Sequence, residues 1–327
     1  RRPPRSTLDR SSAASDVYKR QILGPPAYIG FSAMGAMATD ERMTNLQQLL
    51  GEGDDLDYTK FCRPFGDNMG MVCGESAGFA ILMSDRLALE VGANIRGCFL
   101  NVNINADGNK KSISGPGAGN YFSVGKTFKD IETVFGSKTL QEKSCFLAHG
   151  TGTPLNRVTE SHIVSTFAKE FGIENLPVTS VKSKLGHTMG TAGMDQIWCG
   201  LGALESQKLT GICTIPKLAD DVFKDNLDFF LENKEFNSQK DIAFLNSKGF
   251  GGNNATSALI SSNLTEELLQ RRFTDKELKA WKKKREATLK LREKNFELAV
   301  NSDIEPIYLS LIHISEPTRR RGISYDV

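Results

Sequence analysis

Two short apolar runs, each leading to a histidine and then to a helix-like segment, constrain the fold of this chain most. The first run ends at His149 and precedes a helical pattern over residues 157–171. The second covers residues 177–181, leads to His187 and precedes a helical pattern over residues 194–204. Short strands that alternate with helices of about 10–15 residues are typical of a parallel sheet in an α/β protein. We therefore predict an α/β fold that brings both imidazoles to one side of a sheet.

Other polar groups accompany the two histidines. Lys182 and Lys184 lie in the segment before His187, and Glu160 lies near the start of the helical pattern after His149. Polar side chains at a strand end, beside the start of a closely packed helix, often point into a cleft. A single histidine on a loop is more often structural than catalytic. The functional interpretation therefore depends on the pair, because the whole chain contains only four histidines.

Four sequence blocks resemble the signature blocks of the β-ketoacyl-[acyl-carrier-protein] synthases of the elongating type. They follow one another in that family's order and spacing over residues 22–262. The blocks are Arg63-Pro-Phe65 through Gly74-Glu-Ser-Ala-Gly78, Ala148-His-Gly-Thr-Gly-Thr-Pro154 with Glu160, Lys182-Ser-Lys-Leu-Gly-His187, and Asn246-Ser-Lys-Gly-Phe-Gly-Gly252. The resemblance implies the thiolase fold, in which two similar α/β halves form a layered α/β/α/β/α core, and it implies a homodimer.

The resemblance also divides the chain into segments. Residues 22–110 correspond to the end of the N-terminal thiolase-like half, and residues 111–262 correspond to the C-terminal half. The composition then shifts to Lys, Glu and Arg, and residues 275–300 have the pattern of one long helix. We therefore predict a charged helical extension over residues 263–308. Its basic run, residues 282–285, is predicted to be a solvated face, and a surface for a carrier protein or another partner is the alternative.

The two ends of the chain differ from the rest. Residues 16–21 can be encoded by GATGTGTATAAGAGACAG and residues 309–315 by CTGTCTCTTATACACATCTCC, and the second is nearly the reverse complement of the first. One inverted oligonucleotide at both ends of a reading frame is typical of a transposase-type sequencing adapter. We therefore predict that residues 1–21 and 309–327 are adapter-derived tails without packing partners, and that residues 22–308 are the native fragment.

The charge balance changes when these tails are set aside. The chain has 41 basic and 39 acidic residues; the tails hold nine and four of them, which leaves 32 and 35, a net charge of −3 instead of +2. The basic balance is therefore no evidence for nucleic-acid or membrane binding, and no stretch reaches the ~18 apolar residues of a membrane span. The cysteines lack CxxC spacing, which argues against a zinc site and favours a reducing cytoplasm. They are Cys62, Cys73, Cys98, Cys145, Cys199 and Cys213.

The resemblance implies a decarboxylative condensation of an acyl thioester with a malonyl thioester. Negative charge develops on the thioester oxygen, and neutral imidazoles that donate an N–H stabilise it. By the resemblance His149 and His187 have this role, Lys182 is the family's active-site lysine, and Glu160 is its buried partner. The residues themselves leave open whether Lys182 and Glu160 form a structural ion pair or act electrostatically.

The resemblance also implies a pocket for the acyl chain. Phe250 matches a phenylalanine that gates this pocket, whereas Lys248 takes the place of a second gate residue that is usually aromatic. The other residues assigned to the pocket are small or carry a hydroxyl: Gly251, Gly252, Thr151 and Thr153. The glycine-rich residues 115–127 depart from P-loop spacing, which argues against a nucleotide site. We predict no metal and no cofactor. The phosphopantetheine arm of an acyl carrier protein would enter as substrate.

The family's nucleophile is a cysteine on a strand-to-helix turn, where the helix N-terminus lowers the thiol pKa. None of the six cysteines has this context, and the resemblance places the nucleophile before Ile22. We therefore predict a fragment of a β-ketoacyl-ACP synthase of fatty-acid or polyketide synthesis, an acyltransferase that is inactive as this fragment alone. The alternatives are a decarboxylase without the nucleophile, a partner subunit resembling a chain-length factor, and a thiolase-like acyltransferase.

Overall fold

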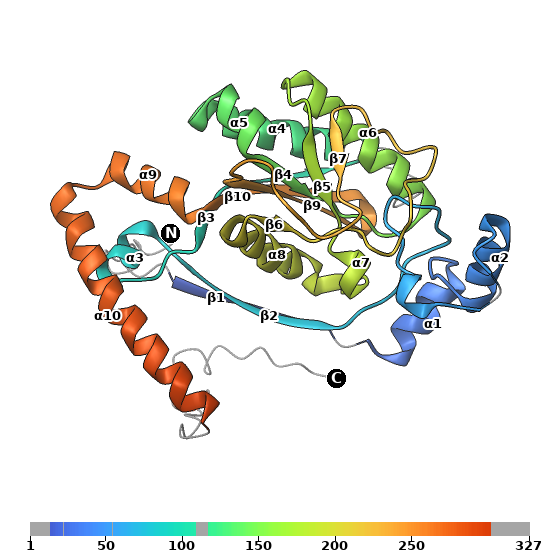
Figure 1. Cartoon of the computed structure of the whole chain (residues 1–327), viewed down its shortest axis with the longest axis horizontal. Helices are drawn as coiled ribbons and strands as arrows, with labels where there is room; N and C mark the ends of the chain where they lie inside the picture. Colours follow the sequence, from blue (N-terminus) through green and yellow to red (C-terminus); the bar gives the residue numbers. More distant parts are fainter. Residues whose placement is uncertain (1–13, 22, 54, 109–116, 302–327) are drawn as a thin grey trace, which may run out of the picture. The chain divides into compact units, whose positions relative to one another are not determined.

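The computed structural model describes residues 14–21, 23–53, 55–108 and 117–301 (Figure 1). A six-stranded mixed sheet lies at the centre of the larger unit of the chain. In spatial order its strands are β3 (Gly97–Ala106), β10 (Asn253–Ser261), β9 (Ile242–Gly249), β4 (Ser144–Leu147), β5 (Leu176–Thr179) and β7 (Leu227–Phe229). The pairs from β9 to β7 are parallel, whereas β10 is antiparallel to both β9 and β3.

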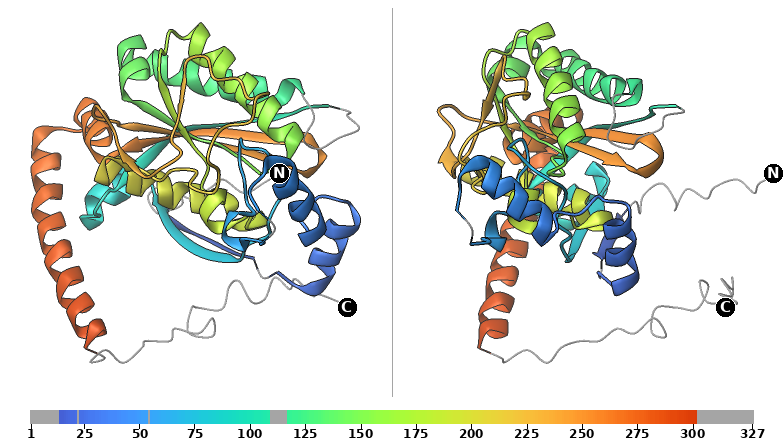
Figure 2. Two further views of the ribbon diagram at one scale, coloured as in Figure 1. Left: turned by 45° about the vertical axis from the view of Figure 1, so that its right-hand side comes forward. Right: turned by 90° about the vertical axis from the view of Figure 1, so that its right-hand side faces the viewer.

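Helices cover both faces of this sheet (Figures 1 and 2). The helices α4 (Ala118–Phe135) and α6 (Pro154–Glu170) lie on one face, and α8 (Ala192–Ser206) lies on the other. All four residues of β4 are buried, and they alternate between the two layers. Phe146 packs in a cluster with Phe128 of α4, whereas Cys145 and Leu147 pack in a second cluster with Leu204 of α8. Burial on both faces explains why these strands read as continuous apolar runs.

The remaining helices and short strands surround these layers. They are α1 (Pro25–Ala33), α2 (Asp40–Leu50), α3 (Asp85–Val91), α5 (Ser137–Lys143), α7 (Lys182–Leu185), α9 (Ser262–Arg272), β6 (Lys208–Leu209) and β8 (Lys234–Glu235). Three short 3₁₀ turns are η2 (Tyr58–Lys60), η3 (Met189–Thr191) and η4 (Phe250–Gly252). The two predicted strand–histidine–helix units correspond to β4 with α6 and to β5 with α8, so the α/β alternation read from the sequence is confirmed.

A separate two-stranded sheet corrects one prediction about the N-terminal end. The strand β1 (Ala14–Gln21) pairs antiparallel with β2 (Ser76–Met83) along its whole length. The prediction that residues 1–21 have no packing partners is therefore wrong for residues 14–21. The physical reason is that an open strand edge offers unpaired N–H and C=O groups to any extended segment, whatever its side chains. Residues 1–13 and 302–327 lie outside the described residues, and their adapter origin stays a prediction.

A smaller unit comprises residues 88–94 together with residues 275–301 of the described chain. Within it α10 (Asp275–Val300) forms the long helix that the sequence predicts. Trp281 anchors this helix, because its buried indole donates to the carbonyl of Ala93 at 3.0 Å. Among the residues that the structure describes, no helix is both long and apolar enough to cross a membrane.

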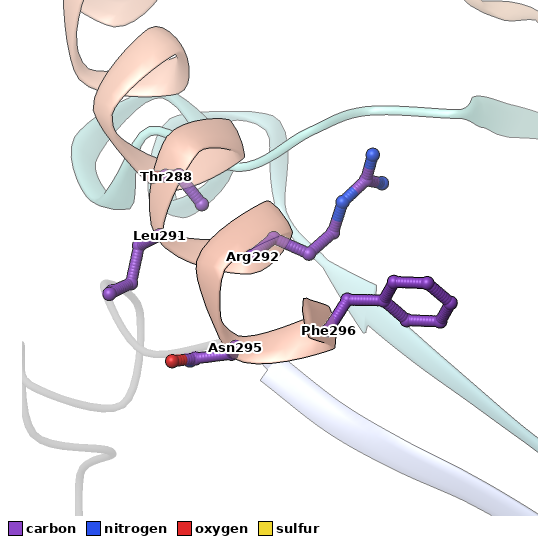
Figure 3. Close-up of a pocket in the computed structure, with 5 residues that line it drawn as sticks. All are labelled: Thr288, Leu291, Arg292, Asn295 and Phe296. Atoms are coloured by element: carbon purple, nitrogen blue, oxygen red, sulfur yellow. The ribbon is translucent and has the colours of Figure 1, made fainter. Parts of the chain in front are cut away.

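A shallow hollow on α10 carries no site of its own (Figure 3). It is lined by Thr288, Leu291, Arg292, Asn295 and Phe296. All five residues come from one helix, and their side chains leave it in different directions (Figure 3). Leu291 and Phe296 are largely exposed there. None of the candidate site residues predicted from the sequence lines this hollow.

Candidate active site

The two histidines meet where the neighbouring parallel strands β4 and β5 end. His149 follows the carboxyl end of β4, and His187 follows β5 and the single turn of α7. Ligand sites in α/β sheets lie beyond the carboxyl ends of such strands. The two imidazole centroids are 5.4 Å apart, and the rings are nearly perpendicular at 86°. Both rings can therefore face the same small ligand group.

The orientation of the His187 ring follows from its own turn. Met189 has a left-handed backbone, with φ of 50°, and its N–H donates to Nδ1 of His187 at 3.1 Å. Because Nδ1 accepts this bond, the proton of the neutral ring is on Nε2. The main chain of His187 is held as well: its N–H donates to Val72 and its carbonyl accepts from Gly74. The block at residues 63–78 therefore supports His187 directly.

Glu160 organises the main chain around His149. Its carboxylate is completely buried and accepts the N–H of His149 at 2.7 Å and the N–H of Gly150 at 2.9 Å. The side-chain amides of Asn156 and Asn246 donate to the same carboxylate, at 2.8 and 2.7 Å. Four donors thus satisfy a group that would be costly to bury unpaired. Glu160 connects the β4 loop, α6 and β9 at one point.

Lys182 is buried and reaches the other side of the same loop. Its Nζ donates to the carbonyl of His149 at 2.6 Å. The contacts of the described residues include no ion pair between Lys182 and Glu160, and of the two alternatives left open by the sequence the structure shows an electrostatic interaction, because Glu160 raises the pKa of Lys182. Both groups instead contact the main chain of His149, which offers an N–H to the carboxylate and a carbonyl to the ammonium. Four hydrogen bonds already satisfy the Glu160 carboxylate, so it does not require direct contact with the Lys182 ammonium.

Burial and the lysine keep both imidazoles neutral. Burial, followed by the positive charge of Lys182, lowers the pKa of His187 to about 3. The same two causes, with smaller contributions from His187 and Lys248, lower the pKa of His149 well below its ordinary value. Burial lowers the pKa of Lys182 to about 8, and the attraction of Glu160 opposes this decrease. At pH 7 the site therefore holds two neutral N–H donors beside one cation.

The residues that the sequence assigns to the substrate pocket lie in two segments, the loop after β4 and the turn η4. The hydroxyls of Thr151 and Thr153 lie 2.9 Å apart beside the His149 loop. Gly251 and Gly252 have φ of 78° and 77°, conformations that favour glycine. The main chain of Phe250 lies in η4, but its side chain falls outside the described residues, so its gating role stays a prediction.

The described cysteines show no activated thiol. Burial raises the pKa of Cys62 and Cys145 to about 12 and that of Cys199 to about 11. Burial also raises the pKa of Cys73 and Cys98. Cys213 is exposed and follows no strand-to-helix turn. Among the residues that the structure describes, no group of three or more His, Cys, Asp or Glu side chains could hold a metal ion.

The sequence patterns assign no role to three further residues of the site: Asn156, Asn246 and Gln196. Asn156 and Asn246 hold Glu160, as described above. Gln196 is buried on α8 and contacts the end of β4 and Asn246 within β9. The contacts of Gln196 and Asn246 join residues 48 to 86 positions apart in the chain, whereas Asn156 contacts Glu160 four positions away. Local sequence patterns contain no signal for the long-range contacts.

Comparison with known proteins identifies the family. The profile described as "Beta-ketoacyl synthase, C-terminal domain" matches residues 100–215, which contain both histidines, Lys182 and Glu160. The chain is 42% identical over 286 residues to the β-ketoacyl-[acyl-carrier-protein] synthase FabY of Pseudomonas aeruginosa, covering 87% of this chain and 44% of that protein. The chain belongs to the β-ketoacyl synthase family. The recognition made from the four sequence blocks is confirmed.

Solved structures give the same fold. The crystal structure of the P. aeruginosa ketosynthase FabY superposes with a TM-score of 0.85 at 39% identity, over 91% of this chain and 47% of that one. The 3-oxoacyl-[acyl-carrier-protein] synthase 2 of Staphylococcus aureus is 30% identical over 233 residues, which is 70% of this chain and 50% of that protein. The fold is thus the thiolase-like α/β fold of the ketosynthases. The chain spans about half the length of these relatives.

Proposed function

We propose that this chain supplies the decarboxylation centre of a β-ketoacyl-ACP synthase of fatty-acid synthesis. The observation that carries the proposal is the pair of neutral imidazoles, 5.4 Å apart, at the ends of adjacent strands. Nε2–H of His187 is free to donate, because Nδ1 is occupied by Met189. Nδ1 of His149 is buried and has no hydrogen-bond partner among the described residues.

The chemistry follows from this placement. When the bond between C2 of a malonyl thioester and its carboxylate breaks, CO₂ leaves and the electron pair moves onto the thioester oxygen. Two imidazole N–H groups aimed at that oxygen stabilise the enolate without transferring a proton. The enolate carbon then attacks the carbonyl carbon of an acyl thioester, a C–C bond forms, the C–S bond breaks, and the thiolate that carried the acyl group leaves. Burial, followed by the charge of Lys182, keeps both imidazoles neutral, so each ring has one N–H to donate.

The partners and the condensation step belong to the same proposal. The relatives' names specify substrates carried on acyl carrier protein, and we extend this carrier and a homodimeric assembly to the present chain. None of the described cysteines is placed as a nucleophile, so the chain by itself should form no acyl-enzyme. The alternative is a partner subunit without a nucleophile; the ishigamide ketosynthase/chain length factor structure, at TM-score 0.60 and 26% identity, keeps it open.

A chimera tests the proposal. Residues 22–262 would replace the matching residues of P. aeruginosa FabY, and conversion of malonyl-ACP to acetyl-ACP would be followed by mass spectrometry. We expect the chimera to decarboxylate, and His149→Ala or His187→Ala to slow it by about 10²–10³-fold, the effect of removing one oxyanion donor. The matched control is His162→Ala, because His162 contacts Tyr121 at 2.7 Å, away from the site. Normal decarboxylation by both site variants would refute the two-histidine assignment.

A further inference from the structure

Gln196 is buried, with 1% of its surface exposed, and makes four hydrogen bonds with residues at the end of β4 and within the neighbouring strand β9. Its Nε2 donates to the carbonyls of Leu147 at 3.2 Å, Ala148 at 3.0 Å and Asn246 at 2.9 Å. Its Oε1 accepts the hydroxyl of Ser247 at 3.1 Å, which fixes which end of the amide faces the carbonyls. One side chain of α8 therefore connects the end of β4 to Asn246 and Ser247 within β9.

The carbonyl of Ala148 belongs to the peptide unit that precedes His149. Gln196 holds this unit at its carbonyl, and Glu160 holds it at the N–H of His149. The next peptide unit is held in the same way, by Lys182 at the carbonyl of His149 and by Glu160 at the N–H of Gly150. Both peptide planes beside the Cα of His149 are therefore fixed at both edges. The direction of its Cα–Cβ bond follows from these two planes.

We propose that Gln196 is a positioning residue for His149, acting through the two N–H groups of its amide. The three partners of Nε2 are all acceptors, so the position requires a donor, and the isosteric Glu cannot replace it. The carboxylate of Glu160 thus accepts from the N–H groups of the loop. The amide of Gln196 and the ammonium of Lys182 donate to its carbonyls. The inference deepens the proposed decarboxylation function and rests on it only for its kinetic consequence.

The test observes His149 directly in the chain as it exists. The chain has four histidines, so selective ¹⁵N labelling gives a simple spectrum, and His149→Gln assigns the signal of interest. We expect Gln196→Glu to shift or broaden the His149 imidazole signals while those of His162 stay in place. The matched control is Gln141→Glu, because Nε2 of Gln141 donates to one carbonyl, that of Phe171, remote from the site. Unchanged His149 signals in Gln196→Glu would overturn the proposal.

A milder variant covers the case in which Gln196→Glu does not fold. Ser247→Ala removes the hydroxyl that orients the amide and leaves the amide in place. We expect it to shift the His149 signals in the same direction by a smaller amount. An unchanged His149 spectrum in Ser247→Ala, together with unfolding of Gln196→Glu, would assign Gln196 to stability alone and overturn the proposal.

The kinetic arm separates this proposal from the proposed function. In the chimera, Gln196→Glu should lower kcat for malonyl-ACP decarboxylation by about 10²-fold, the cost of misplacing a catalytic group, with KM unchanged. Gln141→Glu should leave both constants unchanged. If the chimera decarboxylates nothing while the His149 signals still respond to Gln196→Glu, the proposed function fails and the positioning role stands. If kcat is unchanged in Gln196→Glu, the positioning role fails and the function stands.

Discussion

At the residue scale, the neutral state of His149 and His187 depends first on burial and then on the position of Lys182. Burial and the charge of Lys182 lower the pKa of both imidazoles, and Nζ of Lys182 contacts the main chain of His149. Lys184, two positions later, is exposed and makes no such contact. The two lysines therefore differ in position and not in chemistry, which makes them a matched pair for experiment.

Replacing Lys182 should raise the pKa of His187. In Lys182→Met the second cause of the low pKa is removed and burial remains, so the pKa should move upward from about 3 without reaching its ordinary value. The carbonyl of His149 also loses a donor, which should lower the free energy of unfolding by roughly 1–3 kcal/mol. Titration of ¹⁵N-labelled histidines checks the first effect and chemical denaturation the second. Lys184→Met should change neither, and equal shifts in both variants would contradict the assignment of the loop.

The sign of the pH dependence follows from the same shift. The folded pKa of His187 lies below the unfolded value of about 6.5, so the unfolded chain binds more protons between pH 3 and 6.5. Stability from this residue is complete above about pH 6.5 and is lost as the pH falls, by up to about 1.4 kcal/mol per pH unit. Lys182→Met should make the total loss of stability between pH 6.5 and 3 smaller, because the difference between the folded and unfolded pKa of His187 becomes smaller.

At the element scale, the His187 turn depends on a close approach between two backbones. The segment at residues 72–74 pairs with His187, and Gly74 lies directly against the carbonyl of Leu185. A Cβ built on Gly74 would stand 2.0 Å from that oxygen, a distance that no real contact shows. The requirement for glycine here is steric, because only a residue without Cβ lets the two segments pair.

Gly74→Ala should therefore separate the two segments and destabilise the protein. We expect a loss of about 1–3 kcal/mol in the free energy of unfolding, together with shifted His187 imidazole signals and unshifted His162 signals. The control is Gly202→Ala on α8, where a Cβ would meet nothing within 4 Å. That change should stabilise by up to about 1 kcal/mol, because Ala has the higher helix propensity. Destabilisation by Gly202→Ala equal to that by Gly74→Ala would remove the steric explanation.

At the scale of the whole molecule, the chain divides into two units of very different size. The larger one contains the six-stranded sheet and every residue of the candidate site. The smaller one is held within itself by Trp281, which is 2% exposed, and by the bond from Lys284 to the carbonyl of Glu90. Its loss should therefore leave the site intact.

Trp281→Ala tests this division. Removing a buried Trp costs about 3–5 kcal/mol, so amide hydrogen exchange should accelerate over residues 88–94 and in the first turns of α10. Exchange in β4 and β9 should stay as in the unmodified chain. Phe296→Ala is the control, because that side chain is 68% exposed and its removal should change neither region. Faster exchange in β4 would show that the two units unfold together.

The order of the α/β elements and the two histidines were predictable because their signals are local. Apolar runs such as Ser144–Leu147 are buried on both faces and therefore read as strands, and α10 follows its predicted range. Sequence blocks around His149, His187, Lys182 and Glu160 were sufficient to recognise the family. The pairing of residues 14–21 with β2 was missed, because main-chain groups at a strand edge accept partners without regard to sequence.

What only the tertiary structure decided is how the polar groups share their hydrogen bonds. The sequence left open whether Lys182 and Glu160 form an ion pair or act electrostatically, and folding places both on the main chain of His149. It gave no indication of Gln196, because a buried amide is recognised only by the three carbonyls that surround it. Residue types and spacing determine which side chains reach one end of the sheet. Which donor meets which acceptor there depends on the packing of β4, β9, α6 and α8, because buried polar groups must be satisfied by whatever the fold brings within reach.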